Sequence, residues 1–328
     1  MQGGTSLRQE RLAAALLAVL TLAVIGLSVD RVRLERRLES PCPACDAPAA
    51  RIDRPYRPVE FSTELGEGIT YTGHSGNFID FHVLMYGAYE KPLLHFLRDT
   101  LGALAPTDAV FLDIGANTGQ HSLFLSPFAA QVHAFEPYPP VLRRFRAMVA
   151  GNDIENVVIH PVGLGREAAR VAFHEPDATN MGTGSFVDGF RSADAPVSEL
   201  EIVVGDQALA EAGVEQAHLI KLDVEGYEKP VLEGLRQTLE RSRPVIALEL
   251  TIDPDSQDLF ANEAELRSML PEGYACRSFE SGGADLWTGN YRLRDCRLDF
   301  TRKHQRSLVW YPREHEASIP GLAAVATR

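Results

Sequence analysis

Carboxylates stand at or near the ends of four apolar runs in the sequence, at Asp113, Glu136, Asp223 and Glu249. In open α/β sheets, ligands bind outside the carboxyl ends of the strands, so we expect these side chains to meet at one edge of a sheet. An ionised carboxylate is expensive to bury unless it is paired. The pattern therefore favours a ligand site, although helix capping and surface salt bridges are the structural alternative for Asp113 and Glu136.

The segment 110–122 has the form of a nucleotide-type site. It begins with apolar residues, continues through Gly115 and Gly119, and leads into the amphipathic run 122–125. A strand, a glycine turn and a helix N-terminus direct unpaired N–H groups toward a ligand, and glycines let the backbone approach it. Asn117 stands where a G-x-G-x-x-G dinucleotide loop would have its second glycine, and the Gly-Lys-Ser/Thr of a P-loop is absent.

Glu136 follows the apolar run 131–135, at close to the roughly 20 residues after Asp113 that are expected of an acid that binds ribose hydroxyls. A carboxylate accepts both hydrogen bonds of a cis-diol, which a neutral side chain does less well. We therefore predict that Glu136 holds a ribose and that Gly115 and Gly119 contact the ligand through their backbone. Asp113 is expected to order the loop or to meet the ligand.

Lys221, Asp223 and Glu225 surround the end of another apolar run, 219–222. The alternation of a strand puts Lys221 and Asp223 on the same side of it. A carboxylate there could accept the proton of an attacking hydroxyl, and the lysine would keep that carboxylate ionised. The alternative is a structural ion pair that closes the strand.

Weaker candidates accompany these groups. His121 follows the glycine turn and could face a substrate, but a lone histidine is more often a packed or capping residue. Asn180, Thr183 and Ser185 lie in a polar, glycine-rich loop that could bind a hydroxylated substrate, cover the site or simply be flexible. No cluster of His, Cys and carboxylates has clear metal-ligand spacing, although Asp223 could hold a divalent ion.

Three blocks of the sequence together resemble a known family. They are Asp113 to Gly119 (DIGANTG), Ala134 to Pro137 (AFEP) and Ile220 to Glu228 (IKLDVEGYE). They look like the motifs of the FkbM family of S-adenosylmethionine-dependent methyltransferases and occur in that family's order. The resemblance covers roughly Tyr86 to Pro312 and does not reach the N-terminal region.

The resemblance implies S-adenosyl-L-methionine as cofactor and O-methylation of a sugar, glycolipid or polyketide-like metabolite. Methyltransferases of this fold commonly place substrate-facing groups at the positions of Lys221, Asp223 and Glu225, the expected catalytic residues. The expected cofactor-binding residues are Asp113, Gly115, Asn117, Gly119, Glu136 and Asp153. Asp153 resembles an adenine-side position, but a turn that ends a helix explains it equally well.

Two other functions are weighed against this one. An NAD(P)-dependent oxidoreductase is disfavoured because both G-x-G-x-x-G and a Tyr-x-x-x-Lys pair beside the site are missing. A non-catalytic, membrane-tethered protein that binds S-adenosylmethionine is disfavoured because the carboxylates Asp113, Glu136, Asp223 and Glu225 are intact.

Apolar runs and helical periodicity predict the elements that position these residues. Strands are expected at 109–114, 132–135, 157–161, 219–222, 245–250, 275–279 and 307–311, with a weaker candidate at 202–204. Helices are expected at 89–104, 141–150 and 230–239, after a small β-rich lead-in at 60–81. This order implies an α/β fold with a parallel, doubly wound sheet and an antiparallel hairpin at one edge. The family resemblance implies a Rossmann-like, seven-stranded class I methyltransferase sheet.

Residues 12–29 are almost uninterrupted Leu, Ala, Val and Ile, at the lower length limit of a membrane-spanning helix. More arginines follow this stretch than precede it, which favours an uncleaved anchor with its C-terminal side in the cytoplasm, where S-adenosylmethionine is made. A cleaved signal peptide and an apolar helix outside the membrane are the alternatives. We expect a transmembrane anchor and juxtamembrane helix at 1–40, a linker at 41–58 and an FkbM-type methyltransferase domain at 59–328.

Composition limits the possible partners. The 328 residues are 45% hydrophobic, enough for a sizeable core, and the formal net charge is −13. A nucleic-acid-binding protein would usually have a basic face, so we expect no nucleic-acid partner. The expected partners are a small-molecule, glycan or lipid-linked acceptor and, through the N-terminal helix, a membrane. Four cysteines in a chain of this length do not make a disulfide framework, and Cys42 with Cys45 lacks the second half of a zinc site.

Overall fold

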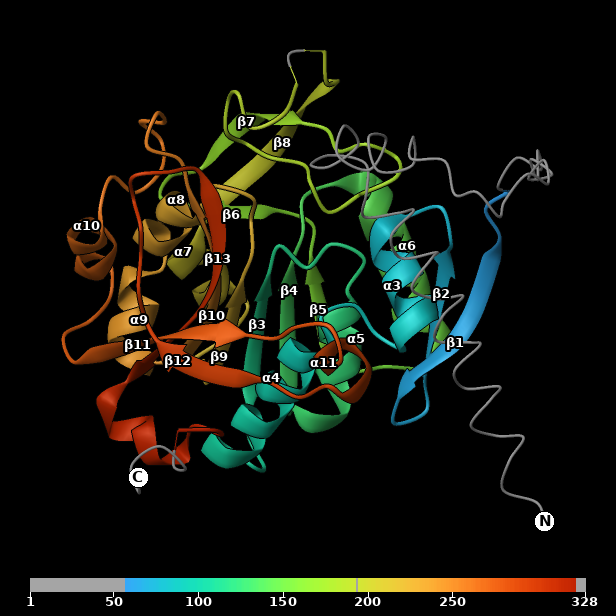
Figure 1. Cartoon of the computed structure of the whole chain (residues 1–328), viewed down its shortest axis with the longest axis horizontal. Helices are drawn as coiled ribbons and strands as arrows, with labels where there is room; N and C mark the ends of the chain where they lie inside the picture. The colour runs from blue at the N-terminus through green and yellow to red at the C-terminus, as the bar shows by residue number, and fades with distance from the viewer. Residues whose placement is uncertain (1–56, 193, 323–328) are drawn as a thin grey trace, which may run out of the picture. The chain divides into compact units, whose positions relative to one another are not determined.

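The computed structural model is built on a central sheet of eight strands, in the order β12-β11-β13-β10-β9-β3-β4-β5 (Figure 1). It describes residues 57–192 and 194–322. The parallel strands of this sheet are β3 (Val110–Ile114), β4 (Gln131–Phe135), β5 (Val157–His160), β9 (Leu219–Leu222) and β10 (Val245–Ile252). All of them confirm predicted strands. β3, β4, β9 and β10 are apolar runs largely buried on both faces of the sheet, whereas β5, at its edge, leaves Val158 exposed.

Antiparallel strands complete the sheet: β11 (Tyr274–Glu280), β12 (Arg292–Asp295) and β13 (His304–Pro312). The two predicted closing strands pair with each other as expected, and β13 also pairs with β10. The expected count of seven strands is wrong, because β12 pairs with β11 and extends the edge. Its sequence, RLRD, has a single apolar residue and gave no strand signal. A short helix, α11 (Asp285–Thr288), also lies between β11 and β13.

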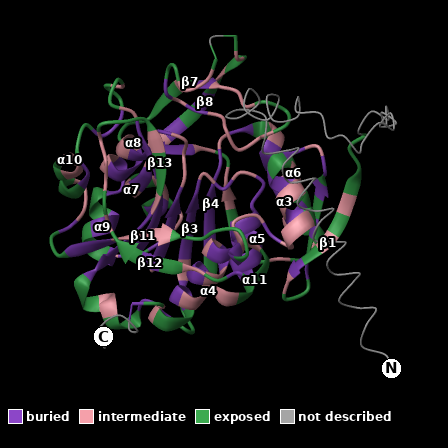
Figure 2. Ribbon diagram, in the orientation of Figure 1, coloured by how far each residue is buried: buried purple, intermediate pink, exposed green. Residues whose placement is uncertain are grey.

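Helices cover both faces of the central sheet. One face packs against α4 (Lys91–Leu104), α5 (Gln120–Leu125) and α6 (Pro139–Gly151), and the other against α7 (Gly205–Glu211), α8 (Glu228–Gly234), α9 (Arg236–Ser242) and α10 (Glu263–Ser268). Alternate residues of β3 serve the two layers: Phe111 packs on the first and Leu112 on the second. Figure 2 shows the resulting buried centre.

The predicted helix 230–239 is divided in two. The backbone at Leu235, with φ −108° and ψ 11°, leaves the helical region between α8 and α9. Pro230 lies in the first turn of α8, where its missing N–H has no intrahelical partner to lose.

An N-terminal hairpin packs beside the glycine turn. It consists of β1 (Glu60–Gly66) and β2 (Ile69–His74) and leads into α3 (Phe78–Tyr86), so the predicted β-rich lead-in ends earlier than expected. The helix begins there because the Asn77 side chain accepts hydrogen bonds from the N–H groups of its first turn. The Tyr71 hydroxyl donates to buried Asp80 at 2.7 Å and lies 3.3 Å from the Thr118 hydroxyl. The hairpin is thereby tied to the loop after β3.

A second sheet, in the order β6-β8-β7, stands apart from the central one. Its strands are β6 (Gly163–Gly165), β7 (Ala169–His174) and β8 (Val197–Val204). The weaker strand predicted at 202–204 is therefore the end of a longer strand, and it does not belong to the central sheet. The loop between β7 and β8 covers the carboxyl ends of the central strands.

Within the described residues, no helix is both long and apolar enough to cross a membrane. The predicted anchor at 12–29, the cysteines at 42 and 45 and nearly all of the linker lie outside them. Cys276 of β11 forms a disulfide with Cys296, directly after β12. This cross-link joins β11 to the segment that directly follows the edge strand β12. Two short 3₁₀ helices, η1 (Ser126–Phe128) and η2 (Arg313–Ser318), complete the described elements.

Candidate active site

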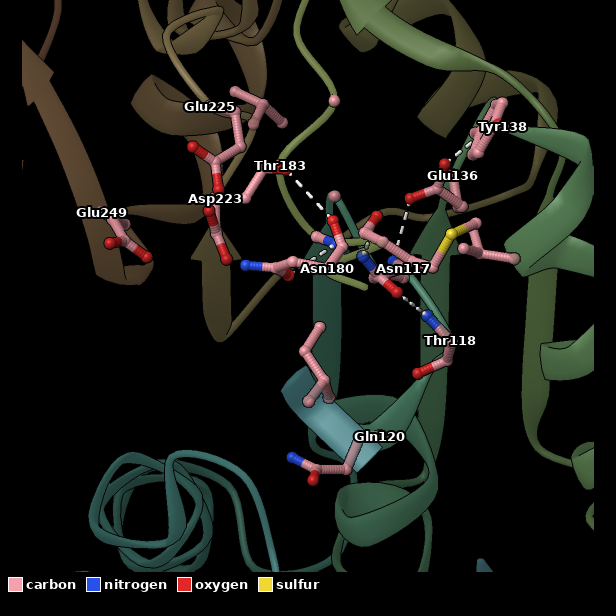
Figure 3. A pocket seen from close by; sticks show the side chains of 18 of the residues that line it. Asn117, Thr118, Gln120, Glu136, Tyr138, Asn180, Thr183, Asp223, Glu225 and Glu249 are labelled. Atoms are coloured by element: carbon pink, nitrogen blue, oxygen red, sulfur yellow. Dashed lines mark hydrogen bonds between the residues drawn. The ribbon is translucent and has the colours of Figure 1, made fainter. Parts of the chain in front are cut away.

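A cavity of about 290 Å³ lies at the carboxyl ends of the parallel strands, beneath the loop that joins β7 to β8. It brings together most of the residues that the sequence singled out. The predicted site residues that line it are Gly115, Asn117, Glu136, Lys221, Asp223 and Glu225. Figure 3 shows Asp223, Glu225 and Glu249 on one side of the pocket and Glu136 with Tyr138 on the other.

Asp113 is fully buried and does not line the cavity. Its Oδ2 accepts a hydrogen bond from the Ser122 hydroxyl of α5 at 2.7 Å, and its Oδ1 lies 4.0 Å from Nζ of Lys221. Asp113 therefore joins β3 to α5 and to β9. Of the two roles expected for it, ordering the loop is the one that the geometry supports.

Gly115 and Gly119 both have φ of +80°, the left-handed conformation that favours glycine. A Cβ on Gly115 would overlap the carbonyl oxygen of Asp223, and a Cβ on Gly119 would overlap the ring of Phe145. The two glycines are thus required by contacts inside the protein. Gly115 also lines the cavity, but the structure does not bring Gly119 to it, which corrects the expected role of that residue.

Glu136 is held from two sides by the backbone. Its Oε1 accepts from the N–H of Tyr138 at 2.7 Å and its Oε2 from the N–H of Asn117 at 2.9 Å. Burial nevertheless raises the pKa of Glu136 to about 7. Each carboxylate oxygen has a second lone pair, so the side chain can still accept hydrogen bonds from a ligand in the cavity.

The structure places Asp153 on the surface, in the turn after α6, and not in the cavity lining. Its φ of 53° and the bond from its N–H to the Ala150 carbonyl agree with the helix-ending turn that the sequence also allowed. Apolar side chains stand beside Glu136 instead: Tyr138, Val141, Phe173 and Met181. The sequence did not indicate this wall, because its members come from separate elements.

Lys221 is buried and surrounded by oxygen atoms. Its Nζ donates to Asp223 Oδ2 at 3.0 Å and to the Gly115 carbonyl at 3.3 Å. Burial alone would lower its pKa, but the carboxylates of Asp223, Asp113 and Glu90 raise the pKa of Lys221 overall. Lys221 and Asp223 lie on the same side of the strand, as the alternation predicted.

Two glutamates beside Asp223 hold their protons more tightly than usual. Burial and the Asp223 charge raise the pKa of Glu225 to about 8. The Asp223 charge, followed by burial, raises the pKa of Glu249 to about 10. Burial and repulsion from Asp223 act on both side chains, with burial the larger cause for Glu225 and the Asp223 charge the larger for Glu249. Glu225 Oε2 also accepts from Nε2 of Gln305 on β13 at 3.0 Å.

Residues that the sequence did not single out complete the site. The Tyr89 N–H donates to Gln120 Oε1 at 2.7 Å, and Gln120 Nε2 donates back to the Tyr89 carbonyl at 2.8 Å. These two hydrogen bonds between the Tyr89 backbone and the Gln120 side chain position the next residue, Glu90. The Oε2 atom of Glu90 lies 3.4 Å from Nε2 of His121. Glu90 went unnoticed because an acid at the start of a helix is ordinarily a capping group.

The glycine-rich loop covers the cavity. Asn117 Nδ2 donates to the Met181 carbonyl at 3.1 Å, and the Ser185 hydroxyl donates to the Glu225 carbonyl at 2.6 Å. Asn180 and Thr183 line the cavity, whereas Ser185 does not. The loop is therefore attached to both halves of the site. Among the described residues, no group of His, Cys, Asp and Glu side chains is arranged to hold a metal ion.

Comparison with known proteins agrees with this geometry. The family described as Methyltransferase FkbM domain matches residues 113–275. Hexuronic acid methyltransferase AglP of Haloferax volcanii is 27% identical over 169 residues, which are 51% of this chain and 66% of that protein. 2-O-methyltransferase NoeI of Sinorhizobium fredii is 28% identical over 189 residues, 53% of this chain and 74% of that protein. 31-O-demethyl-FK506 methyltransferase FkbM of Streptomyces tacrolimicus is 31% identical over 172 residues, which are 44% of this chain and 66% of that protein.

Proposed function

Because residues 113–275 form an FkbM methyltransferase domain, the chain belongs to the FkbM methyltransferase family, and we propose that it methylates a hydroxyl of a sugar, glycolipid or polyketide-like metabolite with S-adenosyl-L-methionine. The sugar and polyketide-like acceptors are supported by the names of the relatives, which include a hexuronic acid and an FK506 methyltransferase. The glycolipid is suggested by the membrane anchor proposed below. When bound, the cofactor supplies a methyl group on a positively charged sulfonium, already a strong electrophile.

The observation that carries the proposal is the charge of the cavity. Asp223, Glu225 and Glu249 face it, and among its described lining residues Lys221 is the one lysine or arginine. The Asp223 charge raises the pKa of both Glu225 and Glu249, so these acids stand close enough to Asp223 to be repelled by it when they ionise. A cationic ligand relieves that repulsion, because an opposite charge nearby stabilises the ionised carboxylates.

The other side of the cavity fits a nucleoside. Glu136 presents a carboxylate whose orientation is fixed by the two backbone N–H groups, so it can accept the two hydrogen bonds of a ribose diol. The apolar wall formed by Tyr138, Val141, Phe173 and Met181 would contact the base. Gly115, whose carbonyl accepts from Lys221, and Asn117, whose N–H donates to Glu136, also line the cavity.

Methylation of a hydroxyl releases one proton, and Asp223 is the residue to which we assign it. Lys221 donates a hydrogen bond to Asp223 Oδ2, which leaves Oδ1 as the oxygen assigned to the acceptor's proton. Glu225 and Glu249, with raised pKa values, can hold protons at neutral pH and donate hydrogen bonds to an acceptor. Alignment of the acceptor by these groups is expected to supply much of the rate.

We also propose that residues 12–29 anchor the protein as a single-pass membrane helix, with the catalytic domain in the cytoplasm. The arginines that follow this stretch support that orientation. Cytoplasmic thiols are kept reduced, so this localisation predicts that Cys276 and Cys296 are free thiols in cells. Trapping of thiols in intact cells tests it, and a disulfide found there would contradict the cytoplasmic placement.

Titration of the full-length chain in detergent with S-adenosylmethionine tests the cofactor assignment. We expect Glu136→Ala to weaken binding about tenfold or more, because it removes a charged acceptor. Glu201→Gln is the matched control, since Glu201 is exposed on β8 and does not line the cavity. Absence of binding, or equal binding by the Glu136 variant, would remove the assignment.

Turnover separates an enzyme from a binding protein. We expect label from methyl-labelled S-adenosylmethionine to appear on a glycan or lipid acceptor, and to disappear with Asp223→Asn. Mass spectrometry compares surface glycans and lipids from cells with and without the protein. In cells without it, the acceptor should be lighter by the mass of one methylene group. If the protein binds S-adenosylmethionine but transfers its methyl group to none of the glycans and lipids tested, the non-catalytic alternative is supported.

A further inference from the structure

A second cavity of about 450 Å³ lies beside the candidate active site. Tyr89 lines both cavities. A small space between them shares four residues with the second cavity: Glu90, Leu93, Phe279 and Ser307. That space also touches Lys221, Asp223 and Glu249. The second cavity, here called the side cavity, is therefore linked through this space to Asp223, the carboxylate assigned to the acceptor's proton.

A row of aromatic rings, here called the aromatic track, runs past both cavities. It consists of Phe78, His82, Tyr86, Tyr89 and Trp287. Ring centroids are 4.2 Å apart for Phe78 and His82, 5.5 Å for His82 and Tyr86, and 4.9 Å for Tyr86 and Trp287. The first three rings follow the i, i+4 spacing of one face of α3, and the last comes from α11.

The track begins at the candidate active site and ends on the surface. Phe78 and Tyr89 line the first cavity, while His82 and Tyr89 line the side cavity. Trp287 is 47% exposed. A large apolar ring left open to water is informative when it continues a row of rings that leads into a site.

Polar groups also line the side cavity. Glu90, Glu280, Ser281 and Ser307 line the side cavity together with His82. Aromatic faces pack well against the C–H faces of a pyranose ring, and carboxylates and hydroxyls accept hydrogen bonds from its hydroxyl groups. An acceptor without hydroxyls along its length would desolvate Glu90 and Glu280 without compensation.

The charge of the two cavities limits the kind of sugar. Glu90 and Glu280 continue the row of acids formed by Asp223, Glu225 and Glu249. The carboxylate of a uronic acid would meet the negative charges of Glu90 and Asp223 along this path, which costs binding energy. An uncharged sugar ring avoids this repulsion and uses the same side chains as hydrogen-bond acceptors.

We propose that the side cavity and the aromatic track form the acceptor subsite, and that this subsite binds an uncharged glycosyl ring and leads its hydroxyl past Glu90 to Asp223. The proposal rests on the proposed function and narrows its acceptor from sugars, glycolipids and polyketides to neutral glycans. It also separates this chain from its relative whose name specifies a hexuronic acid.

The chain offers its own probe for this subsite. It has two tryptophans, of which Trp310 is 1% exposed and Trp287 is 47% exposed. Fluorescence of the full-length protein with S-adenosylhomocysteine should shift to shorter wavelength and saturate when a neutral trisaccharide is added. The trisaccharides used are maltotriose, cellotriose and triacetylchitotriose, with trigalacturonic acid as the charged counterpart.

Binding is measured independently by saturation-transfer NMR of the same trisaccharides. We expect Trp287→Ala to weaken binding of the neutral sugar about tenfold, because a stacked ring is lost. Val158→Ala, which removes an exposed apolar side chain from β5, should leave it unchanged. Tyr86→Leu provides a second variant within the aromatic track.

The affinity of each variant for S-adenosylmethionine is measured in parallel. Loss of cofactor binding in the unmodified protein would count against the proposed function and not against this subsite. The subsite proposal is overturned if no neutral trisaccharide binds, if trigalacturonic acid binds as well, or if Trp287→Ala and Tyr86→Leu both bind normally while retaining cofactor affinity.

Discussion

Lys221 of β9 donates a hydrogen bond at 3.0 Å to Asp223, which directly follows that strand, and both residues line the acid-rich end of the cavity. The same ammonium lies 4.0 Å from buried Asp113. One lysine therefore compensates the charges of two strands that lie next to each other. Removing it leaves these carboxylates without a counter-charge.

We predict that Lys221→Met lowers the free energy of unfolding by about 3–5 kcal/mol, the usual effect of breaking a buried ion pair from one side. Urea unfolding measures it. Lys229→Met is the control, because Lys229 forms an ion pair with Glu265 at the surface and should lose about 1 kcal/mol or less. Adding Asp223→Asn should recover part of the loss in the Lys221 variant. Equal losses for Lys221→Met and Lys229→Met would contradict the buried-pair interpretation.

The pKa of Glu225, raised to about 8, makes stability depend on pH. Between the ordinary glutamate pKa of about 4.3 and a pH of about 8, the unfolded chain releases a proton that the folded protein keeps. The contribution of Glu225 to stability therefore falls as the pH rises through this window. Glu225→Gln removes the effect and can keep the bond from Gln305.

We expect Glu225→Gln to match the unmodified protein near pH 4 and to exceed its stability by about 1–2 kcal/mol at pH 9, after allowance for the remaining exposure of the side chain. Urea unfolding across this range measures the difference. Glu201→Gln, on an exposed part of β8, should show no such trend. A variant that is less stable than the unmodified protein at pH 9 would contradict the assigned shift.

The two glycines of the turn after β3 should respond differently to alanine. Both substitutions require a left-handed backbone, and both place a Cβ against a neighbour, so each should destabilise the fold by at least about 2 kcal/mol. At Gly119 the neighbour is the Phe145 side chain, so Phe145→Leu should offset part of the loss. At Gly115 the neighbour is the Asp223 backbone, which no side-chain change can move.

Thermal and urea unfolding of the single and double variants measure these effects. Gly102→Ala serves as control, because Gly102 lies in α4 with open space around it and should gain about 0.5–1 kcal/mol. No coupling between Gly119→Ala and Phe145→Leu would show that the ring is not the obstacle.

The Cys276–Cys296 disulfide closes a loop whose ends are separated by 20 residues at the edge of the sheet. In the chain-entropy model such a cross-link contributes about 3 kcal/mol. We expect a reductant to lower the stability of the purified, oxidised protein by this order, and to leave the double variant Cys276→Ala/Cys296→Ala unaffected. Mass spectrometry without reduction identifies the linked peptides. Equal sensitivity of both proteins to the reductant would rule this cross-link out as the cause.

The sequence by itself determined the positions of the parallel strands along the chain, the glycine turn and the acids at the strand ends. These are local signals: a buried strand is a continuous apolar run, and a left-handed turn requires glycine at a particular position. The motifs around Asp113, Glu136 and Asp223 consequently led to the cavity. The pairing of Lys221 with Asp223 also followed from local alternation along one strand.

Tertiary structure decided what depends on distant segments meeting. The eighth strand, β12, is held by pairing and not by its own apolar pattern. Glu90 reaches the site because Gln120 fixes the backbone of Tyr89, and the apolar wall beside Glu136 combines α6 with the loop above it. Gly119 and Asp153 carry the right residue types for a ligand, yet one packs against Phe145 and the other faces solvent. Residue type fixes what a side chain can do, but only the packing of the chain fixes what it faces.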